Sequence, residues 1–240
     1  MQAPPLRLTS PLRISTMATL VEGLRRYYTP QEVAEHDTAE NCWVSFFGRV
    51  YDLTPLLDAN KSVLAQPIVD HAGQDLTHWF DAVTQDVKVH VNPATELRVP
   101  YTPMGRFIHI PPPEPTTDWV VDFEKPWWKD DKYAVGSLTR KTRKIRVKNM
   151  LTRQDHLLEV CSEETMAEVL DRYTAFNSHA SSYTWKYTDS KEVGRVLDMA
   201  KTLEESEIPD ERGKFDHLSI DDEYYIPTVH LYFADDLTVA

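Results

Sequence analysis

Residues 42–54 read CWVSFFGRVYDLT, two runs of β-branched and aromatic residues that meet at Gly48. Such runs favour extended strands, and a glycine between them permits the backbone angles of a tight turn. The stretch therefore predicts a β-hairpin, with Thr54 and Pro55 opening a helix directly behind the second strand. A hairpin followed at once by a helix indicates a small mixed α and β domain.

The segments that flank this hairpin carry helix signals. Residues 28–36, YTPQEVAEH, offer a threonine cap, a proline at the first helical position and an acid in the first turn. Residues 67–80, PIVDHAGQDLTHWF, place apolar side chains near helical spacing and are interrupted at Gly73. We expect short helices in both segments.

In the last hundred residues, the spacing of apolar side chains along the sequence changes. Their alternation, or their content of β-branched and aromatic residues, predicts strands at 144–148, 156–160, 183–187 and 229–233. Residues 163–173 have helical spacing of apolar side chains, and Ser162 is the predicted N-cap. The order strand, strand, helix, strand, strand predicts a second α+β domain.

A proline-rich segment separates the two halves. Residues 111–115, PPPEP, can form neither a helix nor a central strand. Four aromatic residues follow, Trp119, Phe123, Trp127 and Trp128. A flexible linker is normally rich in Gly and Ser and poor in aromatics, so we expect this linker to lie extended against a surface, either of its own domains or of a partner.

Composition narrows the class of function. The chain has 26 Lys+Arg against 38 Asp+Glu and a net charge of −12, which disfavours nucleic acid and anionic membranes as partners. No apolar run approaches the roughly 20 residues of a membrane span. Cys42 and Cys161 are the only cysteines, so we expect two free thiols and no thiolate metal cage. The sequence has no nucleophile elbow, phosphate-binding glycine loop or zinc-protease motif, and we expect no enzyme activity.

The first half resembles the cytochrome b5 family. The resemblance runs through Tyr28–His36, through Trp43–Thr54 with its block VYDLT, and through Ala72–Phe80 with its block AGQD. It implies a b5-like domain over about residues 27–107. In that family, two histidines carried on opposing helix pairs clamp a b-type heme, so the resemblance implies heme b as a possible cofactor.

The histidines of this chain depart from the family's pattern. The family's first ligand lies in a His-Pro-Gly-Gly motif, where this chain has Lys61-Ser62-Val63-Leu64, and its second lies near Gln85. His90 follows shortly after and is the first candidate for an axial ligand of heme iron, while His78 and then His71 are weaker candidates. Each of the three also has the plainer interpretation of an ordinary histidine without iron.

The second half resembles ubiquitin-like β-grasp domains, in its order of elements and in a capped turn at Thr202 and Glu205 that precedes Ile208. The sequence ends without a diglycine, which favours a docking module over a conjugated modifier. Its first hairpin carries a basic group of residues, interpreted either as a solvated strand face or as a site for an acidic partner: Lys141, Arg143, Lys144, Arg146 and Lys148.

We therefore expect an α+β protein in four parts: a flexible tail (1–26), a degenerate b5-like domain (27–107), a Pro/Trp-rich linker (108–140) and a ubiquitin-like domain (141–240). This arrangement resembles a b5-domain family of motile cilia. The resemblance implies a cytoplasmic docking subunit of the axoneme, with radial spoke proteins as partners and heme in redox control of beating.

Two other functions fit parts of the sequence. One is a soluble electron-transfer hemoprotein of the cytochrome b5 type, which the missing His-Pro-Gly-Gly motif disfavours because stable ligation there needs two histidines. The other is a small-molecule carrier that uses the vacated heme pocket, suggested by Val63, Leu64 and Ile68 near the lost ligand.

Overall fold

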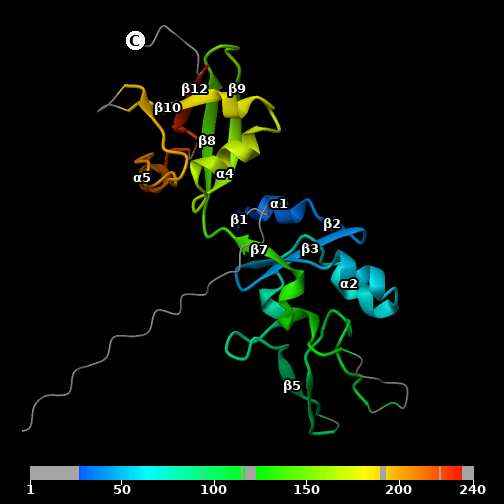
Figure 1. Cartoon of the computed structure of the whole chain (residues 1–240). Helices are drawn as coiled ribbons and strands as arrows, with labels where there is room; N and C mark the ends of the chain where they lie inside the picture. Colours follow the sequence, from blue (N-terminus) through cyan, green and yellow to red (C-terminus); the bar gives the residue numbers. More distant parts are fainter. Residues whose placement is uncertain are drawn as a thin grey trace, which may run out of the picture.

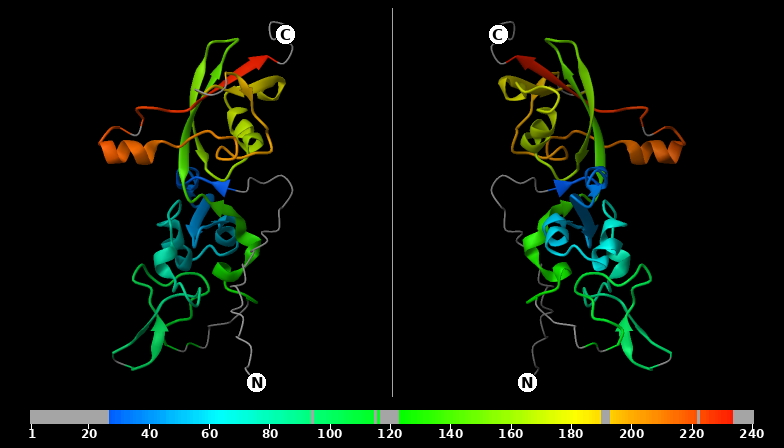
Figure 2. Two further views of the ribbon diagram at one scale, coloured as in Figure 1. Left: turned by 90° about the vertical axis from the view of Figure 1, so that its left-hand side faces the viewer. Right: turned by 90° about the vertical axis from the view of Figure 1, so that its right-hand side faces the viewer.

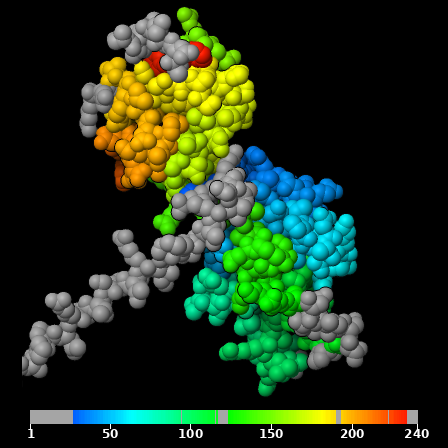
Figure 3. All heavy atoms as spheres, in the orientation of Figure 1, coloured from blue at the N-terminus to red at the C-terminus, as the bar shows by residue number. Residues whose placement is uncertain are grey.

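The computed structural model describes residues 27–93, 95–114, 116, 123–189, 193–221 and 223–233. Each half of the chain forms one domain around a five-stranded sheet. Figure 1 shows the two domains end to end, and Figure 3 shows two lobes that meet at a narrow waist. Trp119 and the tail at 1–26 lie outside the described residues.

The predicted hairpin is the centre of the first domain. Strands β3 (Asn41–Phe46) and β4 (Arg49–Asp52) pair in antiparallel register, with Phe46 opposite Arg49. The two turn residues, Phe47 and Gly48, have φ of 49° and 73°, which is the left-handed geometry of a two-residue hairpin turn. The sequence prediction of this element is confirmed.

The first sheet has the order β1-β7-β4-β3-β2. Short strands β1 (Tyr27–Tyr28) and β2 (Asp37–Thr38) lie at its edges. Strand β7 (Ala134–Leu138) comes from the segment predicted as a linker, yet it pairs with both β1 and β4 inside the sheet. Residues 134–138 thus belong to the first domain, beyond the boundary expected at residue 107.

The helices of this domain are short. Helix α1 (Pro30–Ala34) begins at the predicted cap, where the Thr29 hydroxyl accepts from the Glu32 amide and the Glu32 carboxylate accepts from the Thr29 amide. Helix α2 (Thr54–Ala59) begins one residue earlier than predicted, after Leu53. The Thr54 hydroxyl instead accepts from the Cys42 amide at 3.0 Å, which ties the helix to β3.

The helical run predicted over 67–80 is broken into pieces. It consists of α3 (Gln66–Val69) and the 3-10 helix η2 (Thr77–Trp79), and η1 (Val63–Ala65) precedes it. Gly73, in the turn that follows α3, has φ of +77°. A Cβ there would lie 3.2 Å from the Ala34 backbone, so the glycine allows this turn to pack directly on α1.

A two-stranded ribbon projects from the first domain. Strand β5 (Val89–Val91) pairs with β6 (Arg98–Pro100), and Figure 1 shows β5 at the end of the molecule far from the second domain. Two short 3-10 helices follow before β7, η3 (Trp127–Lys129) and η4 (Asp131–Tyr133). Their aromatic side chains pack in the core of the first domain.

The second sheet has the order β11-β10-β12-β8-β9, in which the central pair, β12 and β8, is parallel and the other pairs are antiparallel. This is the topology of a β-grasp, as the resemblance implies. Its strands are β8 (Thr142–Asn149), β9 (Asp155–Cys161), β10 (Tyr183–Tyr187), β11 (Arg195–Val196) and β12 (Thr228–Phe233).

Two helices lie on opposite sides of this sheet, α4 (Met166–Tyr173) and α5 (Arg212–Leu218) (Figure 2). The N-cap of α4 is Thr165, which forms a capping box with Glu168, so the prediction of Ser162 as the cap is wrong. The short 3-10 helix η5 (Ala180–Ser182) precedes β10. No described helix has the length and hydrophobicity needed to cross a membrane.

Candidate functional site

The hydrophobic core of the first domain lies among α2, α3, η2 and the β3–β4 hairpin. It is filled by aromatic side chains. Trp127 is fully buried, and its ring centroid lies 5.9 Å from Phe46, 6.0 Å from Phe80 and 6.1 Å from Phe107. Trp79 is 2% exposed and lies 5.0 Å from Phe107. The core is therefore packed with the protein's own rings.

Trp128 and Lys129 fix this aromatic group to a loop of the same domain. The Trp128 indole donates to one carboxylate oxygen of Asp86 at 3.0 Å, and the Lys129 ammonium lies 2.5 Å from the other. Burial raises the pKa of Asp86, but the hydrogen bonds from Lys129, the Val87 amide and Trp128 outweigh it and lower the pKa overall. The segment predicted as a linker thus packs on its own domain, one of the two alternatives.

The position of the family's first ligand faces water. Val63 is 88% exposed, and Leu64 is only partly buried at the edge of the core. Ile68 is fully buried, one short helix away. These three apolar residues therefore differ widely in exposure, and the small-molecule carrier stays a hypothesis from the sequence.

His71 and His78 lie on either side of Trp79. The half-buried His71 has its Nδ1 2.8 Å from the Pro67 carbonyl, and its ring meets Trp79 edge-on at 5.1 Å. A carbonyl partner implies that Nδ1 carries the proton, which leaves Nε2 with its lone pair. His78 is exposed on η2, with its ring 6.3 Å from Trp79.

His90 lies on the projecting ribbon and not on a helix. It is exposed in β5, opposite Val99 in β6, and its ring is 5.5 Å from Tyr101. Gln85, near the usual position of the second ligand, is also exposed. The structure brings His71 and His78 together around one indole, and it leaves His90 on a separate element.

Among the described residues, no cluster of side chains is placed to bind a metal ion other than heme iron. The part of the chain that the structure describes holds no group of three or more His, Cys, Asp or Glu placed to bind a metal ion. Cys42 and Cys161 are both buried free thiols, as predicted. Burial, with Asp52 as the second cause for Cys42 and Glu164 for Cys161, raises the pKa of each thiol to about 12. Neither is a reactive thiolate at neutral pH.

Comparisons with known proteins identify the family. The profile of the cytochrome b5-like heme/steroid binding domain matches residues 29–153, well past residue 107. Cytochrome b5 domain-containing protein 1 of Xenopus laevis is 53% identical over 214 residues, which cover 89% of this chain and 96% of that protein. The chain belongs to the cytochrome b5 domain-containing protein 1 family. The human member is 52% identical over 215 residues, 89% of this chain and 92% of that protein.

More distant relatives match a smaller part of the chain. Cytochrome b5 of Candida tropicalis is 35% identical over 63 residues, 26% of this chain and 48% of that protein. Together with the matched heme/steroid binding profile, this likeness supports heme binding by the b5-like domain. The ligand set is where this family member differs from the family's pattern.

The residues present do not fit a heme clamped by two histidines. The three candidate histidines do not converge on one space, and the space between the helices is filled by Trp79, Trp127 and their neighbours. In addition, the indole Nε1 atoms of Trp79 and Trp127 are buried with no hydrogen-bond partner among the described residues. Buried N–H groups without a partner are uncommon in folded proteins, and each one costs free energy.

The sequence did not indicate two features of this region. Trp127 was expected to pack against a surface of its own domains or of a partner, and only the fold shows that it lies in the core of the first domain. The contact between Arg172 and Glu32, described below, joins residues far apart in the chain, and neither side chain stands out from its neighbours in sequence.

Proposed function

We propose that this protein is a non-enzymatic assembly subunit of the motile-cilium axoneme, docked at the radial spokes. Its b5-like domain serves as a folded attachment module. Any heme that this domain carries is held without a histidine pair, which leaves the iron partly open and suits redox control of beating better than electron transfer.

One observation carries the proposal: the b5-like scaffold is kept while the histidine pair is not. The hairpin, the Ala72-Gly73 turn and the capped helix α1 are all present, yet the three candidate histidines lie around Trp79 and on the ribbon. Electron transfer in this fold depends on two imidazoles that hold the iron in both redox states. A scaffold retained without them is best explained by contacts with other proteins.

The short, hydrogen-bonded connection between the domains supports an assembly role. Only three residues separate β7 from β8. The Thr139 hydroxyl donates to one carboxylate oxygen of Glu163 at 2.5 Å, and the Arg140 amide donates to the other at 3.0 Å. The buried guanidinium of Arg172 adds a bidentate contact from the second domain to Glu32 of the first. Such contacts suit a subunit that holds two partners at a set distance.

The β5–β6 ribbon supplies a surface for partners. Val89, Val91 and Leu97 are 59%, 58% and 64% exposed. A two-stranded ribbon is marginally stable alone in water, and exposed apolar side chains on it favour association with another protein. The ribbon also occupies the part of the chain where the b5 family carries its second ligand.

Localisation in ciliated cells tests the proposal. Tagged protein is expected to remain with demembranated axonemes and to form cross-links to radial spoke proteins when a short amine-reactive linker is applied. A tagged protein found entirely in the detergent-soluble fraction, and bound there to a flavin reductase, would instead support the electron-transfer alternative.

A further inference from the structure

The outer face of the second sheet is more basic than the protein as a whole. Strand β8 alternates regularly, so that Lys144, Arg146 and Lys148 are exposed on the side of the sheet opposite α4. Arg143 does not belong to this face: it is 6% exposed and donates to the Ile208 carbonyl at 2.8 Å. In a chain with a net charge of −12, a face with these cations is a local exception.

Three basic side chains form a row across this face. Lys186 of β10 is in register with His230 of β12, and His230 is in register with Lys148 of β8. Neighbouring strands lie about 4.8 Å apart, so the two lysines lie on either side of β12, about twice that distance apart. An anion placed between them would be attracted by both ammonium groups.

His230 lies in the middle of the row. Its Nδ1 is buried and has no hydrogen-bond partner within the described part of the chain. Burial lowers the pKa of His230, and the neighbouring ammonium of Lys148 lowers it further, so the imidazole is neutral at pH 7. A neutral ring between two ammonium groups reduces their mutual repulsion without supplying a counter-ion.

A cavity of about 360 Å³ opens over Lys148 and His230, whereas the Lys186 ammonium lies outside its lining, 5.0 Å from the centroid of the Tyr232 ring. Its lining combines cations, hydroxyl groups and one carboxylate: Arg146, Lys148, Asp155, Thr188, Tyr225, Thr228 and His230. Arg146 pairs with Asp155 at 3.2 Å, whereas Lys148 has no ion-pair partner among the residues the structure describes. One cation and several donors in the cavity are therefore available to an incoming anion.

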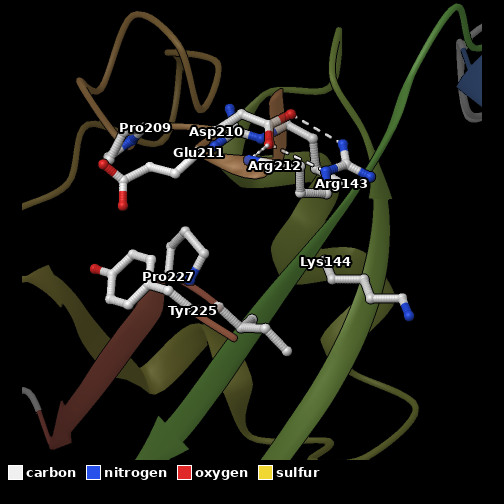
Figure 4. A pocket seen from close by; sticks show the side chains of 9 residues that line it. Arg143, Lys144, Pro209, Asp210, Glu211, Arg212, Tyr225 and Pro227 are labelled. Carbon is white, nitrogen blue, oxygen red and sulfur yellow. Dashed lines mark hydrogen bonds and ion pairs between the residues drawn. The ribbon is translucent and has the colours of Figure 1, made fainter. Parts of the chain in front are cut away.

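A second cavity of about 60 Å³ continues the surface past Tyr225, which lines both cavities. Figure 4 shows the guanidinium groups of Arg143 and Arg212 near Asp210 on one side and Tyr225 with Pro227 on the other. Arg212 is already paired with Asp210 at 2.9 Å. Because Arg212 is already paired, we expect an added anion to bind in the 360 Å³ cavity and not in the smaller one.

We propose that this face, centred on Lys148, His230 and Lys186, binds an acidic peptide segment of a partner protein. Charge complementarity identifies the partner, because a carboxylate in the cavity would contact Lys148 and lie within reach of the row. The carboxylates of Asp155, Glu159 and Glu223 interrupt the face, which disfavours a continuous phosphate backbone. The half-exposed Leu157 and Tyr225 beside the row suit peptide side chains.

The inference rests on the proposed docking function for its place in the cell, and on the geometry alone for the chemistry of the partner. The two can fail separately. A protein that binds the acidic peptide but does not remain with axonemes would contradict the docking function alone. A protein that remains with axonemes but does not bind the peptide would contradict this inference alone.

The test is the binding of a fluorescent oligoglutamate peptide to the full-length protein, followed by fluorescence anisotropy at low and physiological salt. The wild type is expected to bind, with an affinity that falls as salt rises. Lys148→Glu and Lys186→Glu should each weaken binding by about fivefold or more, given that an exposed ion pair contributes up to about 1 kcal/mol and a reversal adds repulsion. The double variant should abolish it.

The matched control is Lys201→Glu. Lys201 is exposed in the same domain but lies beside α4, where its carbonyl accepts from the Met166 amide, and so on the other side of the sheet. It should bind like the wild type. Lys148→Gln removes the charge with less risk to the fold, and thermal unfolding verifies that each variant is folded. Equal affinity in all variants, or tighter binding of a DNA oligonucleotide than of the peptide, would overturn the proposal.

Discussion

The guanidinium of Arg172 in the second domain holds the carboxylate of Glu32 in the first through two hydrogen bonds, of 2.6 and 2.9 Å. The same guanidinium binds Glu164, whose side chain is 1% exposed, and its own side chain is 9% exposed. Burial alone would lower the pKa of Arg172, but the hydrogen bonds and charges of Glu164 and Glu32 raise it overall. The guanidinium of Arg172 thus pairs with Glu164 inside the second domain and also forms the contact with Glu32 of the first domain.

Removal of this cation is expected to destabilise the whole molecule. Arg172→Ala leaves the buried carboxylate of Glu164 without its charge partner, which typically costs about 3–5 kcal/mol. The wild type should unfold in urea as one transition that fluorescence and circular dichroism report identically.

The partner variant separates the two roles of the cation. Glu32→Gln keeps the Arg172–Glu164 pair, and a glutamine can still accept from the Thr29 amide in the capping box of α1. The main loss is the charged contact between the domains, so the cost should be smaller, about 1–3 kcal/mol for charge-assisted hydrogen bonds. Its two domains should unfold at different urea concentrations. A single shared transition in Glu32→Gln, at the wild-type midpoint, would show that the contact does not couple the domains.

Trp127 is expected to be a major source of stability in the first domain. Trp127→Ala opens a cavity among Phe46, Phe80 and Phe107, which typically costs about 3–5 kcal/mol. Trp127→Phe should cost much less, because it also removes the buried indole N–H that lacks a partner. Urea unfolding measures both.

Tyr224→Ala is the control for the Trp127 variants. Its side chain is 75% exposed, and removal of it should change stability by no more than about 0.5 kcal/mol. If Trp127→Ala were as mild as this control, the aromatic group would not form the core of the domain.

The local elements of this fold could be predicted from the sequence because their signals are local. The hairpin at Gly48 and the capped helix at Thr29 depend on neighbouring residues, and both are confirmed. The role of the 108–140 segment could not be predicted in this way. Its prolines predicted a linker. The positions of β7 and of Trp127 depend instead on contacts with residues about eighty positions earlier in the chain.

The candidate site shows the same limit. The sequence showed the loss of the first histidine motif, and the resemblance made His90 the first candidate for a ligand without indicating the element that carries it. Alternating Val89, His90 and Val91 instead form a strand, since β-branched neighbours favour extended backbone. Whether any of the three histidines contacts heme iron stays a prediction.

Stability should fall as the pH drops below about 6.5, the ordinary pKa of histidine. Because the pKa of His230 is lowered in the folded protein, the unfolded chain binds more protons just below that value. Proton uptake by the unfolded chain then favours unfolding, so stability rises with pH through this window and is complete above it. Urea midpoints measured between pH 5 and 7.5 test this slope.

His230→Gln removes this contribution and should flatten the slope. His217→Gln, at an exposed position on α5, should retain it. An unchanged slope in His230→Gln would mean that other groups cause the acid sensitivity.

His90 should contribute little to the fold. It is exposed on the ribbon, so His90→Ala should change the urea midpoint by no more than about 0.5 kcal/mol in free energy. If His90 is nevertheless the surviving ligand, this variant should lose the Soret absorbance of heme-reconstituted protein. Retained absorbance in His90→Ala, with His71→Ala as the parallel variant, would exclude that role.

The most direct test of the account is low-temperature electron paramagnetic resonance of the full-length protein reconstituted with ferric heme. We predict that no low-spin signal of an iron with two imidazole ligands is present, because the structure does not place two histidines on one heme. A stoichiometric low-spin bis-imidazole signal, accompanied by a reversible reduction potential, would contradict the claim that the b5-like domain has lost its histidine pair.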